Sequence, residues 1–280
     1  MDITKKSNIQ QILSENGIAP LKKLGQNFLC DKNIVEKIAS AAADDFIVEI
    51  GPGLGALTCA LSERAQKVVA IEIDGGMVRA LASTLAGCSN AAVIHADILK
   101  TDIGAVAKEH FGAGVPFSIA GNLPYYITSK CLLAAVECGA PVRRFTAMVQ
   151  KEVADRLSAE PGSRTYGALT ASLQYYGKTK TLFDVSADCF LPRPDVDSAV
   201  IQLAPSAAFG VDRERYSRAV RGLFSMRRKT VLNNMKSAFH LSGETAQAML
   251  EKAEIDVTAR AEALSPADFA RLAAVLPQQP

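Results

Sequence analysis

The chain has 280 residues, enough for one large domain or for a large and a small one. Its 49% hydrophobic and 21% charged residues are typical of a folded globular protein and exclude a disordered or fibrous one. The net charge of +2 neither favours nor excludes a nucleic-acid partner.

Targeting segments and metal ligands are not apparent. The N-terminal residues contain no apolar stretch of signal-peptide length, and no segment approaches the roughly 20 apolar residues that cross a bilayer. We therefore expect a cytoplasmic protein without membrane contact. The six cysteines are scattered without a CxxC pair and the three histidines lie far apart, so we expect neither a metal site nor disulfides.

From residue 46 onward, short runs rich in β-branched residues alternate with helical patterns. The runs are FIVEI (46–50), KVVAIEI (67–73), AAVIHAD (91–97), FSIAGN (117–122) and FTAMVQ (145–150). This alternation is typical of βα units that build a parallel sheet. We therefore predict an α/β fold with a Rossmann-like sheet.

Polar residues end four of these runs. They are Glu49, Glu72, Asp97 and Asn122, at intervals of 23, 25 and 25 residues. In an open α/β sheet the carboxyl ends of the strands form the ligand crevice. Each residue alone could simply cap a helix, but four in register favour one shared ligand site.

A glycine-rich loop follows the first of these strands, in EIGPGLGALT (49–58). Gly51, Gly53 and Gly55 let the backbone turn tightly and approach a ligand, with the N–H groups of the next helix facing it. The loop nearly satisfies GxGxxG, with Ala56 in the last position, so the loop alone also fits a dinucleotide.

Glu49 favours a different ligand, because a carboxylate inside a buried strand is costly unless it faces a cation. S-adenosylmethionine carries an ammonium and a sulfonium, whereas the pyrophosphate of a dinucleotide would be repelled by Glu49. We therefore predict S-adenosylmethionine as cofactor and the sheet of a class I methyltransferase. Glu72 would then accept from the ribose hydroxyls, and Asp97 from the adenine amino group.

The fourth strand ends in Asn122, Leu123, Pro124 and Tyr125, where the methyl acceptor is expected. An adenine amine is a poor nucleophile, but the Asn122 side-chain oxygen and the Leu123 carbonyl could accept its two N–H groups and turn the lone pair to the methyl carbon. Pro124 stiffens the turn, and Tyr125 offers a face for base stacking worth roughly 1–3 kcal/mol. The alternative is a strand-to-helix turn capped by Asn122.

The C-terminal part differs in pattern. SAVIQLAP (198–205) predicts the last strand and is followed by a linker, and helices are predicted over 212–222, 226–239, 242–253 and 266–275. We place the methyltransferase domain at residues 1–206 and a small helical domain at residues 207–280. Between Arg213 and Lys236 there are eight basic residues and one acidic residue, which could be a solvated helix face or a binding surface.

Together these motifs resemble the ribosomal RNA adenine N6-dimethyltransferase family, which also includes the erythromycin-resistance rRNA methyltransferases. The likeness covers nearly the whole chain. KKLGQNFL (22–29) is similar to the family's N-terminal segment, which implies that Asn27 and Leu29 contact the donor. FLPRPDVDSAV (190–200) matches another family element, which implies that Phe190 stacks on the target base opposite Tyr125.

SMRRKTVLNN (225–234) resembles the branch with a helical C-terminal domain that acts on small-subunit rRNA. The resemblance implies an enzyme that dimethylates N6 of two adjacent adenosines near the 3′ end of 16S rRNA, within the immature 30S subunit late in assembly. It also implies that the C-terminal domain binds RNA phosphates through basic residues such as Arg221, Arg227, Arg228 and Lys229. We expect a monomer, since no long exposed apolar stripe favours a dimer.

Three other interpretations are less consistent with the sequence. A 23S rRNA methyltransferase giving macrolide resistance would share the fold, but the helical C-terminal part argues against it. A non-catalytic assembly factor or RNA chaperone would not need Gly51, Glu72, Asp97 and Asn122 together. A dinucleotide oxidoreductase would need a proton donor near the crevice, and none is evident.

Overall fold

The chain packs as two compact units. The structure is a computed structural model that describes residues 2–20, 25–124, 127–206 and 209–277. Unit 1 contains Met1–Ala154 and Lys180–Pro205, and unit 2 contains Asp155–Thr179 and Ser206–Pro280. The chain passes from unit 1 to unit 2 between Pro205 and Ser206, and the expected boundary lies between residues 206 and 207. Residues 155–179 are expected in the first domain, but they pack in unit 2.

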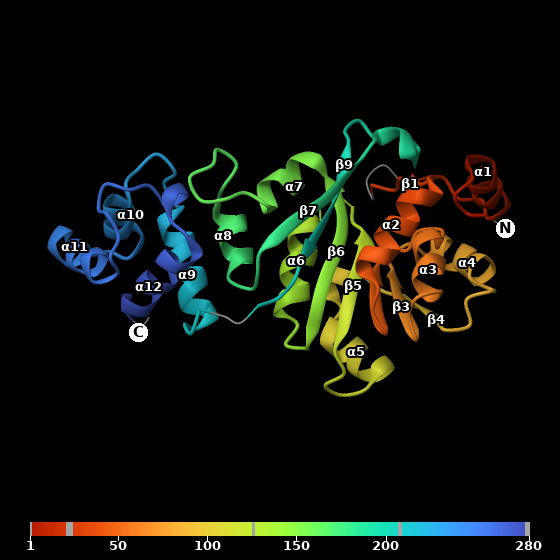
Figure 1. Ribbon diagram of the computed structural model, residues 1–280, viewed down its shortest axis with the longest axis horizontal. Helices are drawn as coiled ribbons and strands as arrows, with labels where there is room; N and C mark the ends of the chain where they lie inside the picture. The colour runs from red at the N-terminus through yellow and green to blue at the C-terminus, as the bar shows by residue number, and fades with distance from the viewer. Residues whose placement is uncertain (1, 21–24, 125–126, 207–208, 278–280) are drawn as a thin grey trace. The chain divides into compact units, whose positions relative to one another are not determined.

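Unit 1 is built on a seven-stranded sheet with the strand order β4-β3-β2-β5-β6-β9-β7 (Figure 1). Strands β4, β3, β2, β5 and β6 pair in parallel, and β9 pairs antiparallel to β6. This arrangement confirms the predicted α/β fold. The strands are β2 (Phe46–Ile50), β3 (Lys67–Glu72), β4 (Ala91–His95), β5 (Phe117–Asn122), β6 (Val142–Gln150), β7 (Thr179–Val185) and β9 (Ser198–Leu203).

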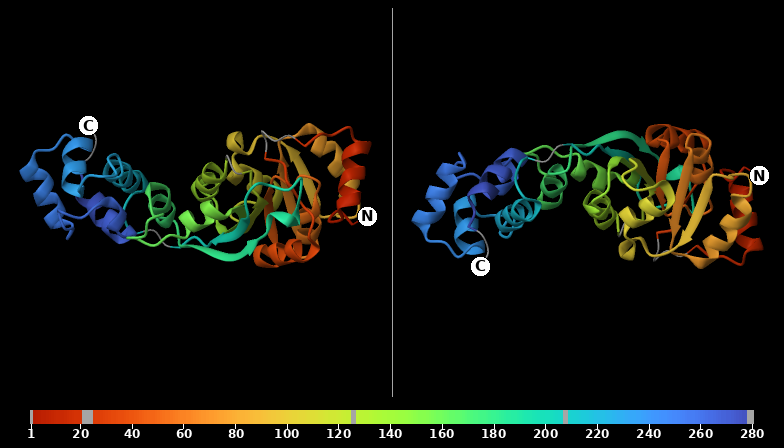
Figure 2. Two further views of the ribbon diagram at one scale, coloured as in Figure 1. Left: turned by 90° about the horizontal axis from the view of Figure 1, so that it is seen from above. Right: turned by 90° about the horizontal axis from the view of Figure 1, so that it is seen from below.

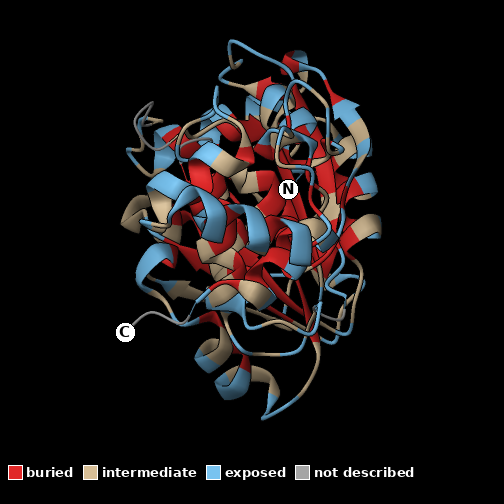
Figure 3. Ribbon diagram, turned by 90° about the vertical axis from the view of Figure 1, so that its left-hand side faces the viewer, coloured by how far each residue is buried: buried red, intermediate tan, exposed pale blue. Residues whose placement is uncertain are grey.

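Helices cover both faces of this sheet, with α2 and α3 on one face and α5 and α6 on the other (Figure 2). The central strands are therefore buried on both sides, which explains their continuous apolar runs. Buried positions lie along the strands and on the inner faces of the helices (Figure 3). The helices of this part are α1 (Lys6–Glu15), α2 (Lys32–Ala42), α3 (Ala56–Ser62), α4 (Gly75–Thr84), α5 (Ile103–Phe111) and α6 (Thr128–Glu137), with the 3-10 turns η2 (Ile98–Lys100) and η3 (Ala187–Cys189). Helix α7 (Lys151–Leu157) begins in unit 1 and ends in unit 2.

A second, two-stranded ladder lies outside the main sheet. Strand β1 (Phe28–Leu29) pairs antiparallel with β8 (Phe190–Leu191), so that Leu29 lies opposite Phe190. Cys30 N–H also donates to the Cys189 carbonyl at 2.7 Å. These bonds tie the N-terminal segment to a stretch of chain some 160 residues away in sequence.

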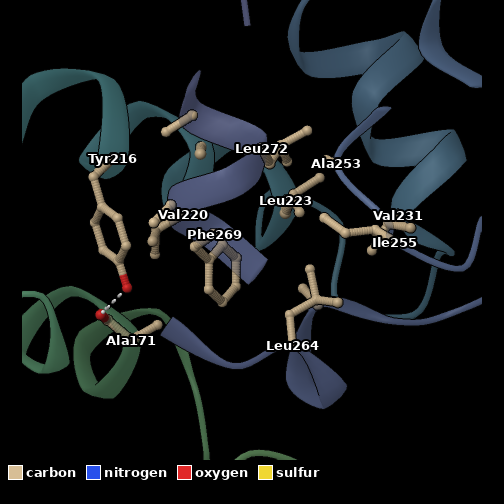
Figure 4. Packing of buried hydrophobic residues seen from close by; sticks show 14 of the residues in the cluster. Ala171, Tyr216, Val220, Leu223, Val231, Ala253, Ile255, Leu264, Phe269 and Leu272 are labelled. Atoms are coloured by element: carbon tan, nitrogen blue, oxygen red, sulfur yellow. Dashed lines mark hydrogen bonds between the residues drawn. The ribbon is translucent and has the colours of Figure 1, made fainter. Parts of the chain in front are cut away.

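Unit 2 has its own core of aromatic and aliphatic side chains (Figure 4). Tyr216 is central: its ring lies 4.8 Å from that of Tyr175, and its hydroxyl donates to the Ala171 carbonyl at 2.9 Å. These contacts explain why residues 155–179 belong to unit 2. Its elements are α8 (Ala168–Gln174), α9 (Arg213–Leu223), α10 (Val231–Ala238), α11 (Gly243–Lys252), the 3-10 turn η4 (Ala261–Ala263) and α12 (Pro266–Val275).

Capping residues set the first residues of helices α10 and α12 in unit 2. Ser265 and Asp268 form the capping box of α12, and Pro266 is its first residue. The helix predicted over 226–239 is wrong at its start, since α10 begins at Val231. The reason is that the Thr230 hydroxyl caps the helix by accepting from Asn233 N–H, which leaves residues 225–229 as a loop.

Candidate active site

One cavity lies at the carboxyl ends of β2, β3, β4 and β5. Ile50 at the end of β2 pairs with Ile71 of β3 and with Gly121 of β5, so the strand ends are level with one another. The cavity has a volume of about 220 Å3. The four polar residues predicted at the strand ends all line it: Glu49, Glu72, Asp97 and Asn122.

The N-terminal segment supplies another wall of this cavity. Asn27 and Leu29 both line it, together with Gln26 and Phe28. The ladder between β1 and β8 holds this segment in position, and the Asn27 side chain is fixed by donation to the Gly25 carbonyl at 3.3 Å. The structure thus places both of the predicted N-terminal residues at the site.

The glycine loop that follows β2 lines the cavity. Gly51 and Gly53 line the cavity with φ angles of +68° and +57°, in the left-handed region that favours glycine. A Cβ on Gly53 would also lie 3.5 Å from the Phe28 ring. The loop therefore brings bare backbone to the cavity surface, as the sequence predicts.

Glu72 is held by the backbone around it. Its Oε2 accepts from Gly53 N–H at 3.1 Å, and its Oε1 accepts from Asp74 N–H at 2.9 Å. Burial raises the pKa of Glu72, and the same backbone N–H groups oppose that rise. Because an ionised carboxylate has about four acceptor positions, capacity remains for a ligand's hydroxyl groups.

Glu49 is the least solvated acid at the site, with 1% of its surface exposed. Its Oε2 has no hydrogen-bond partner among the residues that the structure describes. Burial raises the pKa of Glu49 to about 8, and the neighbouring Glu72 carboxylate adds to the rise. A buried carboxyl with an unpartnered oxygen at a cavity wall is suited to meet a cation.

Asp97 both caps a 3-10 turn and lines the cavity. Its Oδ1 accepts from Leu99 N–H at 2.9 Å and so caps η2, which agrees with the capping interpretation. Its Oδ2 lies 3.9 Å from Lys100 Nζ on an exposed side chain. Asp97 nevertheless lines the cavity, so the cap and the ligand site share this residue.

Asn122 is oriented by the N-terminal segment. Its Nδ2 donates to the Asn27 carbonyl at 3.1 Å. Because that carbonyl can only accept, the side-chain amide is held with its nitrogen toward Asn27, and Oδ1 is left as an acceptor. Pro124 also lines the cavity, and Leu123 lies behind it with 1% of its surface exposed. Tyr125 lies outside the described residues.

Phe190 is placed differently from the sequence expectation. Its side chain is 2% exposed and packs in the core of unit 1, and Leu29, its partner in the ladder, lines the cavity. It is absent from the residues that line the cavity in the described part of the chain. Stacking on a base would require the ring to leave this core.

Sequence reasoning missed two apolar residues at the site. Ile73 and Leu99 line the cavity, yet they are 48% and 40% exposed. Large aliphatic side chains left open to solvent at a cavity mouth are suited to contact the faces of a flat ring. The available signal was an apolar residue close behind each acidic strand end, since Ile73 follows Glu72 directly and Leu99 is two residues after Asp97.

The four basic residues predicted to bind RNA are all exposed in unit 2. Arg221 lies in the last turn of α9, and Arg227, Arg228 and Lys229 lie in the following loop rather than on a helix. Arg227 also donates to the Arg164 carbonyl at 3.2 Å, and two neighbouring arginines make similar contacts. Arg215 and Arg218 donate to backbone carbonyls at the end of α12 and beyond it, including Leu276 and Pro277.

The described residues form neither a metal cluster nor a membrane span. No group of three or more histidine, cysteine, aspartate or glutamate side chains is placed to bind a metal ion there. Within the ranges that the structure describes, no helix combines the length and apolar character needed to cross a membrane.

This chain is similar to several small-subunit rRNA methyltransferases. Ribosomal RNA small subunit methyltransferase A of Shouchella clausii is 41% identical over 285 residues, covering 98% of this chain and 96% of the relative. The same enzyme of Leuconostoc mesenteroides is 40% identical, covering 100% and 97%.

Solved structures are also similar to this chain. A dimethyladenosine transferase from Plasmodium falciparum has a TM-score of 0.72 at 26% identity, covering 86% of this chain and 94% of that one. The 23S rRNA methyltransferase ErmE has a TM-score of 0.70 at 27% identity, covering 90% and 100%. The family described as ribosomal RNA adenine dimethylase matches residues 20–278, and the chain therefore belongs to this family of rRNA methyltransferases.

Proposed function

We propose that the protein dimethylates N6 of two adjacent adenosines near the 3′ end of 16S rRNA, in the immature small ribosomal subunit. The observation that carries the proposal is the orientation of Asn122, whose amide nitrogen is held by the Asn27 carbonyl so that Oδ1 is left as an acceptor. The small-subunit enzymes of relatives are about 40% identical over almost the full chain, whereas ErmE is 27% identical. The small-subunit substrate is therefore favoured over 23S rRNA.

The residues of the cavity fit S-adenosylmethionine as methyl donor. The unpartnered Oε2 of Glu49 suits a cationic group, and Glu72 and Asp97 offer acceptors for hydroxyl and amino groups. Ile73 and Leu99 suit the faces of an adenine ring. When bound, this donor supplies a methyl group on a positively charged sulfur that serves as the leaving group.

The chain's own contribution to transfer is positioning. The Asn122 Oδ1 accepts one N–H of the target amine, and the Leu123 carbonyl is the proposed second acceptor. Two acceptors draw the amine toward a pyramidal geometry with its lone pair directed at the methyl carbon. No strong base is needed, because the proton leaves after methylation, when the nitrogen is cationic.

The target base would be held by aromatic side chains. We assign stacking to Tyr125 and, on the opposite face, to Phe190. Because Phe190 is 2% exposed, this second contact needs a shift of β8 when RNA binds. The adenine must also leave its own stack, which costs least in a loop or single-stranded segment.

RNA binding outside the cavity is assigned to unit 2. Arg221, Arg227, Arg228 and Lys229 are exposed and belong to a segment with almost no acidic residues. Such side chains bind phosphates and make affinity depend on salt. We also propose that the assembled small subunit, rather than free RNA, is the substrate, and that the protein acts as a monomer.

The proposal is tested by transfer of labelled methyl groups from S-adenosylmethionine to small subunits that lack the modification. Wild-type protein should place two methyl groups on each of two adjacent adenosines, and Asn122→Ala should abolish transfer. Large subunits and protein-free 16S rRNA serve as alternative substrates. Transfer to large subunits only would favour the 23S enzyme, and binding without transfer would favour a non-catalytic assembly factor.

A further inference from the structure

The segment between α9 and α10 forms a short loop that we call the basic loop, residues 225–229. Three of its five residues are cationic and exposed: Arg227, Arg228 and Lys229. Charged residues of this kind repel one another, and an unrestrained loop would adopt many backbone conformations. Within the loop, Lys229 N–H donates to the Met226 carbonyl at 3.0 Å and closes a turn.

The side chain of Asn234, on α10, holds that backbone. Asn234 is fully buried, with 0% of its surface exposed. Its Oδ1 accepts from Met226 N–H at 3.0 Å and from the Ser225 hydroxyl at 3.3 Å. Its Nδ2 donates to the carbonyls of Met226 at 3.2 Å and Lys229 at 3.4 Å.

These four bonds reach both ends of the basic loop from one side chain. Only an amide offers an acceptor and two donors in such a small group, so aspartate, leucine or alanine could not replace it. Asn234 is also too buried to contact RNA itself. Its polar groups are used within the protein, and the side chains that it places are the exposed cations.

We propose that Asn234 is a positioning residue for RNA binding, which fixes the basic loop so that Arg227, Arg228 and Lys229 face phosphates together. The inference rests on the proposed function of unit 2. A loop that is ordered before binding loses less conformational freedom on binding, so affinity is higher than for the same charges on a mobile loop.

The test measures binding of the full-length protein to small ribosomal subunits that lack the modification, over a range of salt concentrations. One variant combines Arg227→Ala, Arg228→Ala and Lys229→Ala, and it should lower the slope of log affinity against log salt by about two to three. Asn234→Asp keeps the acceptor but loses both donor bonds. It should weaken binding about tenfold and also lower the salt slope.

A matched control is Asn233→Ala, which removes the neighbouring exposed asparagine whose side chain bonds only the Thr230 hydroxyl in the described structure. It should leave affinity and slope unchanged. Asn234→Asp added to the triple variant should cause no further loss, because both changes remove the same contacts. Because aspartate adds a negative charge beside the cations, Ser225→Ala, which adds none, is measured as well. A purely structural role would lower its melting temperature and leave its salt slope unchanged.

Two failures are distinguishable. If the triple variant binds as wild type does, the assigned RNA surface is wrong. If the triple variant weakens binding while Asn234→Asp keeps wild-type affinity and slope, only the role of Asn234 is overturned. Should Asn234→Asp fail to fold, Ser225→Ala is a milder change. It removes one of the four bonds, together with the bond that the Ser225 hydroxyl donates to the Gly222 carbonyl at 2.7 Å. A lowered slope then supports the proposal, and an unchanged slope overturns it.

Discussion

The side-chain amide of Asn122 donates to the backbone carbonyl of Asn27, 3.1 Å away, across 95 residues of sequence. The N-terminal segment thus sets the orientation of the residue at the end of β5. In turn, Asn27 lies next to β1, which is held by β8. The Oδ1 atom of Asn122, the proposed acceptor for the target amine, is therefore positioned by three separate parts of the chain.

Asn122→Asp should lower the rate of methyl transfer about 100-fold. A carboxylate cannot donate to the Asn27 carbonyl, so the two oxygens repel one another and the acceptor moves from its position. The measurement is single-turnover methyl transfer at saturating donor. Asn90→Ala is the control, since Asn90 donates to the Ser62 and Ala65 carbonyls away from the cavity. Equal losses in both variants would contradict a specific role for Asn122.

Glu49 should make the unfolding free energy of the donor-free protein depend on pH. Burial raises the pKa of Glu49 from 4.5 to about 8, so between these values the folded chain keeps a proton that the unfolded chain has released. Stability contributed by this group is therefore lost as pH rises from 4.5 toward 8. Denaturant unfolding at several pH values measures the effect.

Glu49→Gln should remove this part of the pH dependence, because glutamine does not titrate. Glu63→Gln serves as control, since the Glu63 side chain is 71% exposed. An identical pH dependence in wild type and Glu49→Gln would show that Glu49 is ionised in the folded protein.

Binding of the cationic donor should release a proton from Glu49. A nearby cation favours the ionised carboxylate, so the pKa of Glu49 falls on binding and affinity rises with pH up to about 8. Calorimetric titration at pH 7 in two buffers with different ionisation enthalpies measures the protons released. Wild type should release protons and Glu49→Gln should release fewer, whereas equal release would assign the proton to another group.

Much of unit 1 could be predicted from sequence because its strands are short, apolar and regularly spaced. The four polar strand ends and the glycine loop are local patterns with a known place in a parallel sheet. Strand β7 was missed because only Thr179 and Val185, at its ends, are buried, and the exposed and partly buried residues between them give no clear apolar run. The assignment of residues 155–179 to unit 2 was missed for another reason: it depends on long-range contacts such as Tyr216 with Ala171.

The roles of single atoms at the site were the least predictable part. Nothing in the sequence indicates that Asn122 is oriented by the Asn27 carbonyl, or that Asp97 both caps η2 and lines the cavity. Phe190 shows the limit of inference from resemblance, because a motif gives the residue but not the burial of its ring.

Gly121→Ala should destabilise unit 1 by about 1–3 kcal/mol and reduce methyl transfer. A Cβ on Gly121 would lie 2.5 Å from the Ile50 carbonyl oxygen, which belongs to the backbone of β2 and cannot move without disturbing the sheet. Because the next residue is Asn122, the displacement reaches the acceptor atom. Chemical denaturation and methyl transfer are measured together.

The control is Gly87→Ala, where an added Cβ has no atom within 4 Å. It should retain both stability and activity. If Gly121→Ala is as stable as the wild type, β2 and β5 can separate enough to admit a methyl group.

Tyr216→Phe should destabilise unit 2 by about 1 kcal/mol. The change leaves the Ala171 carbonyl without its 2.9 Å hydrogen bond in a buried position and keeps the ring's packing. Hydrogen exchange should therefore accelerate in α8 as well as in α9, because the bond joins residues 155–179 to the C-terminal helices. Acceleration confined to α9 would show that other contacts hold α8. The Tyr216–Ala171 bond would then contribute little to joining residues 155–179 to the C-terminal helices.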